Sequence, residues 1–399
     1  MATLQPFRAL RPKTEDAAAV AAVPYDVVST DEARALADGN AVSFLRVSRA
    51  ELELPAGTDP YGAAVYERAA RNFAQLRRSS FVADEEPRAY VYRLQMGGHV
   101  QTGVAACYSL DEYDRDIVRK HERTRPDKED DRTRHMVALR AQTGPVFLTY
   151  RADDSVDLAA ERVTAGEPVA DFDAPDGVRH TVWRASGADS AALVTAFARI
   201  PALYIADGHH RAASAARAWR QLQQPEASTF LGVAFPHDQV QILPYNRVVK
   251  ELNGLTPERF VSAVRERFAI EDGGPAPARR GEIAMYVERR WRTMRPLAAL
   301  NPSNPIEALD VSVLQDRLLA PVLNITDVRT DKRIDFVGGA RGTDALEQLV
   351  DSGQAAAAFS LYPVSVADLM EVSDAGEIMP PKSTWFEPKL RDGLLIHLI

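Results

Sequence analysis

The 399-residue chain lacks the features that would place it outside the cytoplasm. Its only cysteine, Cys107, excludes an internal disulfide and a cysteine-based zinc site. Long apolar runs are missing as well, because the run 17–23 is far shorter than the ~20 residues that a membrane span requires. Charged residues at positions 8, 11, 13, 15 and 16 interrupt any secretory signal near the start. We therefore expect a soluble, cytoplasmic protein with no membrane partner.

The chain also lacks a surplus of positive charge. Its 48 Lys and Arg residues against 56 Asp and Glu residues give a net charge of −8, which repels nucleic acid in bulk and predicts no nucleic-acid partner. With 46% hydrophobic and 26% charged residues, the composition is globular and excludes a disordered, collagen-like or coiled-coil chain. The length predicts two domains, which we expect at residues 1–252 and 253–399.

Several motifs of known chemistry are absent. The sequence has no G-x-x-x-x-G-K-[ST] phosphate loop and no G-x-G-x-x-G after a strand, so neither a P-loop enzyme nor a dinucleotide-binding domain of that type is expected. The patterns H-E-x-x-H and G-x-S-x-G are missing too, which disfavours metalloprotease and hydrolase chemistry.

Helical and extended patterns alternate along the chain and predict a mixed α/β fold. Gly97-Gly98 and Asp176-Gly177 each indicate a hairpin. Further strands are expected at 42–47, 145–150, 203–206, 229–235 and 240–243. Helices are expected at 31–38 (capped by Thr30), after Asp59-Pro60 towards Arg78, at 189–200 and after Thr256. The last hundred residues have strand–helix–strand–helix spacing, which predicts a smaller C-terminal α/β domain. The stretch 273–277 is a linker or a loop inside that domain.

The pattern with the most chemical content is the turn Asp207-Gly208-His209-His210-Arg211, which lies between an apolar strand and an alanine-rich helix. The first N–H groups of a helix have no partner inside it and, together with the helix dipole, they bind anions. His210 and Arg211 add donors, and Ser214 and Arg217 lie on the same helix face as His210. The turn therefore suits a phosphate group. Alternatively, its polar residues only cap the helix.

A second candidate lies in the charge run 111–135, whose nine acidic and eight basic residues nearly cancel. Arg123 and Arg125 flank a loop that a proline ends, so they could clamp a second phosphate. Glu122 or Asp127 would then contact Mg²⁺. The alternative is a solvated, salt-bridged face, which most such runs form.

Two shorter motifs are further candidate sites. Pro24-Tyr25-Asp26 is typical of a structural pair locked by a turn, although its carboxylate could accept a proton from a substrate hydroxyl. Lys382-Ser383-Thr384 is bracketed by prolines and favours a C-terminal strand with a stiff turn.

Together, these motifs resemble a bacterial family. Asp207–Arg211, His121–Thr124 and Pro380–Thr384 are similar to motifs of the family called domain of unknown function 1015, and they span most of the chain. The turn Asp207–Arg211 also resembles, more distantly, the nucleotide-binding turn of the ParB/sulfiredoxin superfamily. That likeness implies a ParB/sulfiredoxin-like nucleotide-binding core with insertions in residues 1–252.

The superfamily contains sulfiredoxin, CTP-binding chromosome-partition proteins and ADP- or ATP-dependent free serine kinases. Sulfiredoxin uses a cysteine in this turn, where the present chain has His209. Partition proteins add a helix-turn-helix and a basic DNA-binding surface, for which the sequence gives no signal. The resemblance therefore favours the kinase branch, with ATP or ADP and Mg²⁺ as cofactors.

We accordingly expect a nucleotide-dependent phosphotransferase, a small-molecule kinase acting on a hydroxylated metabolite such as free serine. In this hypothesis the catalytic residues are Asp207, His209, His210 and Arg211, and the metal ligands for Mg²⁺ are Asp207 and Glu122. The residues expected to bind the nucleotide are Gly208, Ser214, His121, Arg123 and Arg125. Two alternatives stay open: a non-catalytic nucleotide-binding regulator, and a phosphohydrolase in which His209 is the nucleophile.

Overall fold

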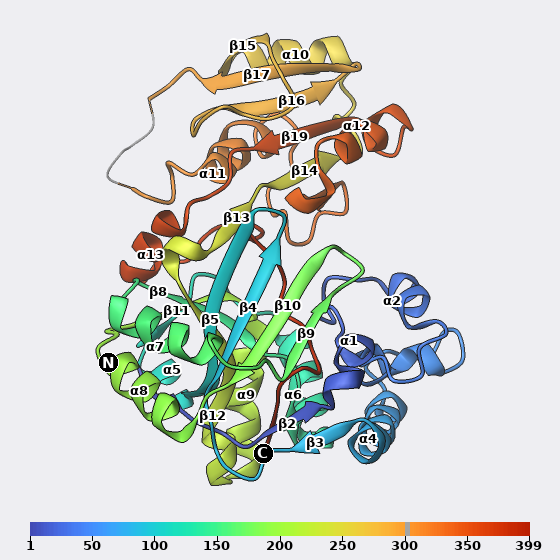
Figure 1. Ribbon diagram of the computed structural model, residues 1–399. Helices are drawn as coiled ribbons and strands as arrows, with labels where there is room; N and C mark the ends of the chain where they lie inside the picture. Colours follow the sequence, from blue (N-terminus) through green and yellow to red (C-terminus); the bar gives the residue numbers. More distant parts are fainter. Residues whose placement is uncertain (300–303) are drawn as a thin grey trace. The chain divides into compact units, whose positions relative to one another are not determined.

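The computed structural model describes residues 1–299 and 304–399 (Figure 1). By its internal contacts the chain divides into two compact units, one made of Met1–Val240 with Pro388–Ile399 and the other of Gln241–Glu387. The chain thus returns to the first unit after it has built the second. The two domains expected at 1–252 and 253–399 stay a prediction, and the division by contacts falls after Val240.

The largest sheet among the described residues has nine strands and lies in the first unit. Its strands are β1 (Leu4–Gln5), β4 (Tyr90–Met96), β5 (His99–Ser109), β6 (Val118–Arg119), β8 (Val146–Tyr150), β9 (Ala170–Asp173), β10 (Val178–Arg184), β11 (Leu203–Asp207) and β12 (Thr229–Pro236). Eight of them follow the order β6-β11-β8-β12-β5-β4-β10-β9, and β1 pairs with β5. The pairs β11–β6 and β12–β8 are parallel and the other pairs are antiparallel.

Both predicted hairpins are confirmed, and each has a glycine in the left-handed region. Gly97 between β4 and β5 has φ +57°, and Gly177 between β9 and β10 has φ +78°. Tight hairpin turns need positive φ because their backbone twist then matches that of the strands. Glycine adopts this conformation without steric cost, which is why these dipeptides predicted the turns.

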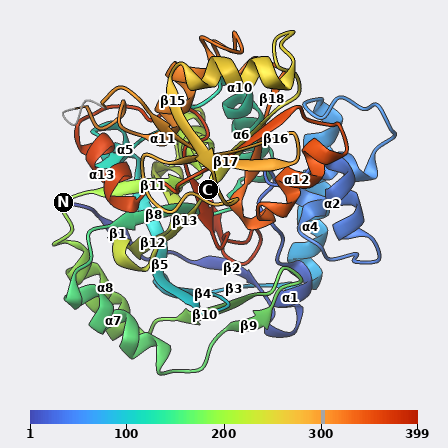
Figure 2. The same ribbon diagram turned by 90° about the horizontal axis from the view of Figure 1, so that it is seen from above.

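The helices of the first unit cover this sheet and extend beyond it. They are α1 (Ala17–Val20), α2 (Thr30–Ala37), α3 (Leu45–Ser48), α4 (Ala63–Ser79), α5 (Leu110–Asp114), α6 (Pro126–Leu139), α7 (Asp154–Thr164), α8 (Gly187–Phe197) and α9 (His209–Leu222). Helix α9 contacts α6, β8 and β12, and its buried residues Ala212, Ala215, Ala216 and Ala218 belong to the main hydrophobic core. Figures 1 and 2 both show α7 beside α8, away from α2 and α4.

A four-stranded sheet in the order β3-β2-β21-β7 brings the end of the chain into the first unit. Its strands are β2 (Ala9–Pro12), β3 (Phe81–Ala83), β7 (Ala141–Gln142) and β21 (Ile396–Leu398). β21 pairs with β2 on one side and with β7 on the other. Residues near both ends of the chain therefore share one small sheet.

Two local predictions in this region were wrong. Ser29 caps α2 in place of Thr30, because Ser29 forms a reciprocal capping box with Glu32. The strand predicted at 42–47 is not formed, and α3 begins at Leu45 instead. Phe44, Leu45 and Val47 are all buried, and a short apolar run that is buried on every side suits a helix as well as a strand.

The second unit contains an antiparallel sheet in the order β15-β17-β16-β19-β14-β18. The helices and strands of the second unit are β13 (Gln241–Leu243), β14 (Tyr245–Val249), α10 (Pro257–Arg265), β15 (Phe268–Asp272), β16 (Ile283–Val287), β17 (Arg290–Pro296), α11 (Asp310–Leu314), β18 (Ile334–Gly338), α12 (Asp344–Asp351), β19 (Ala357–Leu361), α13 (Val366–Asp374) and β20 (Trp385–Glu387). The predicted strand–helix–strand–helix order is confirmed by β18, α12, β19 and α13. The stretch 273–277 lies between β15 and β16, inside this unit.

The two units together give the mixed α/β fold that the sequence predicted. None of the helices in residues 1–299 and 304–399 is both long and apolar enough to cross a bilayer.

Candidate functional site

Strand β11 leads directly into helix α9 through the turn Asp207–Arg211. Gly208 has φ +94°, a conformation that side chains with a Cβ rarely adopt, and a Cβ there would lie 2.9 Å from Nε of Arg211. Glycine is therefore required at this position for two independent reasons. Helix α9 starts at His209 without a side-chain cap from Gly208, so its first N–H groups face the turn.

Arg211 folds back from α9 towards the sheet and is only 5% exposed. Its Nη2 lies 3.1 Å from Oδ2 of Asp207, and Nη1 donates to the carbonyl oxygen of Pro145. Nε of Arg211 is buried and has no hydrogen-bond partner among the described residues. Lys389 adds a second cation, with Nζ 3.8 Å from the same oxygen of Asp207. Asp207 thus lies between two positively charged side chains.

The loop 120–125, between β6 and α6, lies against the start of α9. The backbone N–H of His121 donates to Nε2 of His209 over 3.4 Å, and that of Arg125 donates to Nε2 of His210 over 3.0 Å. The rings of His121 and His209 meet edge to face, with centroids 4.4 Å apart. Donor atoms of His121, Glu122 and His209 all lie within 4.8 Å of one another. The structure therefore brings two sequence-predicted motifs together.

Both imidazoles of this contact are neutral at pH 7. Burial lowers the pKa of His121 to about 4, although a backbone hydrogen bond with Ile205 and the charge of Asp207 raise it. Burial also lowers the pKa of His209 well below its usual range, and the neighbouring His121 lowers it further. Neutral rings offer a lone pair rather than a positive charge, so these two histidines do not add cationic attraction for a phosphate.

Two charged residues that sequence reasoning missed complete the site: Arg132 of α6 and Asp392 near the chain end. Asp392 interacts electrostatically with Arg211, Asp26 and Arg132, and the backbone of Tyr25 hydrogen bonds to it. The guanidinium of Arg132 lies 4.0 Å from the ring centroid of Tyr25. We call Asp26, Arg132, Arg211 and Asp392 the arginine–aspartate cluster. Arg132 is one of many charged residues in the run 111–135, so the sequence pattern did not single it out. No motif around Asp392 marked that residue either.

The charges in the arginine–aspartate cluster perturb one another. Burial raises the pKa of Asp392 to about 7, while Arg211 lowers it and Asp26 raises it. Burial lowers the pKa of Arg211, but the nearby carboxylates raise it overall, so the guanidinium stays charged. Oδ1 of Asp392 is buried and has no hydrogen-bond partner among the described residues. A carboxyl group that titrates near neutrality beside a fixed cation is typical of sites that move protons.

Other predicted residues lie at the edge of this site or away from it. Arg123 and Arg125 are exposed, and Arg125 pairs with Asp127 at 2.9 Å on the surface. Ser214 is fully buried and donates to the carbonyl oxygen of Glu129, and Arg217 also pairs with α6. The face shared by Ser214 and Arg217 therefore contacts a helix. Their expected contact with a ligand gains no support from this geometry and stays a prediction.

The Lys382-Ser383-Thr384 motif belongs to the second unit. The hydroxyl of Ser383 donates to the carbonyl of Pro380, and Lys382 accepts a hydrogen bond from the buried Arg247. These bonds shape the turn that precedes β20, in agreement with the structural interpretation.

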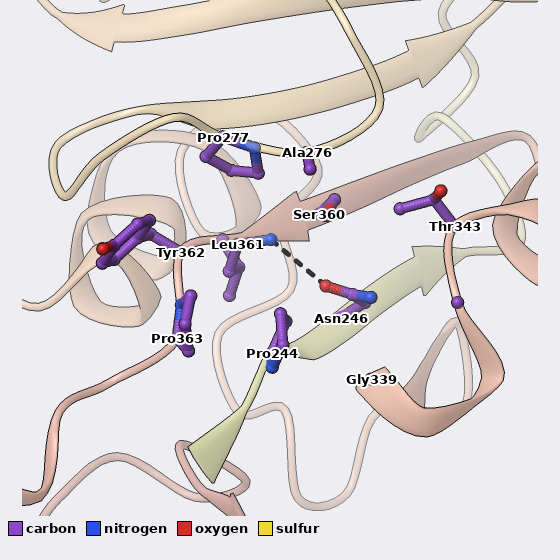
Figure 3. A pocket seen from close by; sticks show the side chains of 11 residues that line it. Pro244, Asn246, Ala276, Pro277, Gly339, Thr343, Ser360, Leu361, Tyr362 and Pro363 are labelled. Carbon is purple, nitrogen blue, oxygen red and sulfur yellow. Dashed lines mark hydrogen bonds between the residues drawn. The ribbon is translucent and has the colours of Figure 1, made fainter. Parts of the chain in front are cut away.

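The second unit also contains a pocket of about 140 Å³ (Figure 3). Its lining residues are Pro244, Asn246, Ala276, Pro277, Gly339, Gly342, Thr343, Ser360, Leu361, Tyr362 and Pro363. The side chain of Asn246 accepts a hydrogen bond from the backbone of Leu361, as Figure 3 shows. No residue of the predicted site lines this pocket.

Comparison with known proteins agrees with the sequence motifs. The model of a family described as "Protein of unknown function (DUF1015)" matches residues 4–312. No curated protein matches this chain.

Among solved structures, three similar ones are a free serine kinase in complex with AMP, a conserved hypothetical protein from Pyrococcus furiosus, and C-terminally truncated SbnI from Staphylococcus aureus. The kinase is 16% identical, with 72% of this chain and 91% of that chain covered and a TM-score of 0.37. The Pyrococcus protein is 16% identical, with 74% of this chain and 95% of that chain covered and a TM-score of 0.37. SbnI is 12% identical, with 72% of this chain and 85% of that chain covered and a TM-score of 0.40. Because these TM-scores lie below 0.5, we infer nothing about this chain's ligand from them.

Proposed function

This chain belongs to the DUF1015 family, whose description assigns no activity, and we propose that it is a nucleotide-dependent phosphotransferase. The phosphoryl donor would be ATP or ADP, and the acceptor a small metabolite with a hydroxyl group. Free serine is the first acceptor to test, since the turn Asp207–Arg211 resembles that of free serine kinases. The observation that carries the proposal is the buried Arg211 at the uncapped N-terminus of α9, with Nε left without a partner.

The start of α9 has the properties of an anion site. Its first N–H groups and the positive end of the helix dipole attract negative charge, and glycine at position 208 leaves room for the Arg211 guanidinium beside the turn. Arg211 is fixed by Asp207 and Pro145, so the guanidinium is already oriented before a ligand binds. A preorganised cation is what phosphoryl transfer needs, because little covalent chemistry falls to the protein.

The arginine–aspartate cluster supplies groups that could handle the proton of the acceptor hydroxyl. Asp26 is exposed and interacts electrostatically with Arg211. In our proposal Asp26 accepts this proton as the hydroxyl oxygen attacks the terminal phosphorus. The bond from that phosphorus to its bridging oxygen breaks, and AMP leaves from ADP, or ADP from ATP. Asp392 is a buried carboxyl group that interacts electrostatically with Asp26 and Arg211, so its charge state changes the field that both experience.

The residues predicted to bind Mg²⁺ do not fit that ion well. Asp207 is already held by Arg211 and Lys389, and Glu122 lies beside two imidazoles. Mg²⁺ prefers six oxygen ligands and keeps several waters, whereas the other possible ligands beside Glu122 are ring nitrogens of His121 and His209. We therefore assign no step to an ion bound by Asp207 and Glu122.

The phosphohydrolase alternative has less support from the geometry. A phosphohistidine intermediate requires an imidazole nitrogen that a substrate phosphate can reach, and His209 is only 6% exposed. The regulator alternative uses the same anion site and differs only in turnover.

Thermal shift and calorimetry with ADP, ATP and CTP, each with Mg²⁺, test the proposal. A ligand stabilises the folded chain by RT ln(1 + [L]/Kd), so a weak nucleotide still registers at high concentration. ³¹P NMR on the best binder, with serine and then other hydroxylated metabolites, identifies the product. Binding without transfer to any acceptor would support the regulator, and release of inorganic phosphate alone would support the hydrolase. Absence of nucleotide binding would refute the proposal.

A further inference from the structure

Two imidazoles and one carboxylate meet beside the start of α9. His121 and Glu122 are neighbours in the loop 120–125, and His209 is the first residue of the helix. Their donor atoms lie within 4.8 Å of one another, and both histidines are buried. Two imidazole nitrogens with one carboxylate oxygen are a common ligand set for transition metals in proteins.

The positions of the two rings are fixed by backbone groups. The His121 ring forms a hydrogen bond with the backbone of Ile205 in β11. Metal-binding histidines characteristically make such a bond with one ring nitrogen, which orients the other towards the ion. The geometry around His121 therefore matches that of a preorganised ligand.

The hydrogen bond from the backbone of His121 to the ring of His209 is longer than a typical structural hydrogen bond. The His121 N–H to His209 Nε2 distance is 3.4 Å, while the neighbouring bond from Arg125 to His210 measures 3.0 Å. Typical N–H hydrogen bonds are near 2.9–3.0 Å, so the lone pair on Nε2 of His209 is only loosely engaged. That lone pair faces the loop that carries His121 and Glu122.

We propose that His121, Glu122 and His209 bind one divalent transition-metal ion, with Zn²⁺ as the best candidate and Mn²⁺ or Co²⁺ as substitutes. Three protein ligands leave a fourth position for water or for an oxygen of a bound ligand. Tetrahedral coordination at ~2.1 Å places ligand atoms about 3.4 Å apart, so ligand atoms that now lie within 4.8 Å of one another must approach by at most about 1.4 Å. Glu122, which is half-buried on a loop, can make most of this movement.

The local charge favours a cation at this position. Glu122 brings a negative charge, and Asp207 acts electrostatically on both histidines. Arg211 also acts on His209 and opposes a cation, but its guanidinium is paired with Asp207. This proposal does not rest on phosphotransfer, because the same three ligands would bind the ion in a regulator or a structural centre.

The test uses the full chain, stripped with a chelator and then titrated with Zn²⁺ by calorimetry and with Co²⁺ by visible absorption. We expect one equivalent of tightly bound Zn²⁺ and the intense d–d bands of tetrahedral Co²⁺. Glu122→Gln keeps the shape of the side chain and should weaken binding by more than about tenfold, as should His209→Gln. Controls are His135→Gln, which removes a buried imidazole on α6, and Glu161→Gln, which removes an acid on α7; both should bind as the unmodified chain does.

Absence of a one-equivalent site, or equal affinity and equal Co²⁺ spectra in Glu122→Gln and in the unmodified chain, would overturn the proposal. Since Glu122 is only half-buried, its variant stays informative even if His209→Gln unfolds, and circular dichroism checks both. Nucleotide affinity measured on the stripped chain separates this outcome from that of the proposed phosphotransferase. A chain that binds nucleotide but no Zn²⁺ would refute only the metal site.

Discussion

The backbone N–H of Arg125 donates a hydrogen bond to Nε2 of His210, although 85 residues separate them in the chain. Nε2 therefore carries no proton, and a neutral His210 has its proton on Nδ1. This bond fixes the end of the loop 120–125 to the first turn of α9. It explains how a charge-rich segment, which alone would be a solvated surface, becomes one wall of the candidate site.

Replacing His210 by Ala should release this end of the loop. A single hydrogen bond contributes about 1 kcal/mol, so amide exchange at Arg125 should accelerate roughly fivefold. Hydrogen–deuterium exchange resolved at single amides measures this directly. Unchanged exchange at Arg125 would mean that the bond does not hold the loop in solution.

Arg211→Lys should reduce turnover strongly and should have a smaller effect on the stability of the chain without nucleotide. Lysine keeps the charge but lacks the planar fork that contacts Asp207 and Pro145 together. We expect a loss in kcat/KM of about 100-fold or more, as for other preorganised donors. The matched control is Arg220→Lys on the same helix, whose exposed pair with Asp114 should be dispensable. Equal activity in both variants would contradict the assignment of Arg211.

Asp392→Asn should change how stability depends on pH. Burial raises the pKa of Asp392 to about 7, so the folded chain holds a proton that the unfolded chain releases near pH 4. The stabilisation from this proton is complete below pH 4 and is lost as the pH rises through 7. Relative to the unmodified chain, the variant should therefore gain stability between these values, by up to about 4 kcal/mol. Urea unfolding at pH 5 and pH 8 measures the difference, and a pH-independent difference would contradict the prediction.

His135 should make the stability of the fold depend on pH in the opposite direction to Asp392. Burial, together with the charge of Arg132, lowers the pKa of His135 from the usual 6.5 to about 4, so the folded chain keeps this ring neutral while the unfolded chain protonates it. The resulting stability is present above pH 6.5 and is lost as the pH falls towards 4. His135→Gln should reduce the acid-induced loss by up to about 3 kcal/mol, measured by unfolding at pH 7 and pH 4.5. An equal loss of stability on acidification in His135→Gln and in the unmodified chain would show that His135 is not involved.

Ser214→Ala tests whether this buried serine serves the fold or a ligand. Its hydroxyl bonds to the Glu129 carbonyl and links α9 to α6, so the variant should lose about 1 kcal/mol of stability. Nucleotide affinity should be unchanged. A large drop in nucleotide affinity without a loss of stability would instead support the contact between Ser214 and the nucleotide that the sequence predicted.

The parts of the fold that the sequence predicted are those specified by local chemistry. The turn residues Gly97 and Gly177 of the two hairpins, the capping Thr256 of α10 and the proline that starts α6 each act within a few residues. The unit of β11, Gly208 and α9 was predicted for the same reason. The run 42–47 was misassigned because its apolar residues are buried by tertiary packing, which the sequence pattern does not encode.

The candidate site was predicted only in part. The turn at Asp207 and the motif at His121 were both recognised, but nothing in the sequence indicated that a backbone N–H of one would bond to an imidazole of the other. Asp392 could not be assigned, since its role depends on burial beside Arg211 and on backbone pairing with Ala22. Such contacts arise from the topology and leave no local signature.

The return of Pro388–Ile399 to the first unit has a consequence for biosynthesis. The segments that carry Asp26, Arg132 and Arg211 emerge from the ribosome well before Asp392 and β21 are translated. Until that last segment arrives, the two arginines lack one of their carboxylate neighbours and β2 lacks its partner β21. Maturation of the first unit must therefore wait for the whole of the second to be synthesised, and a nascent chain stalled near residue 387 should remain sensitive to proteolysis around the arginines.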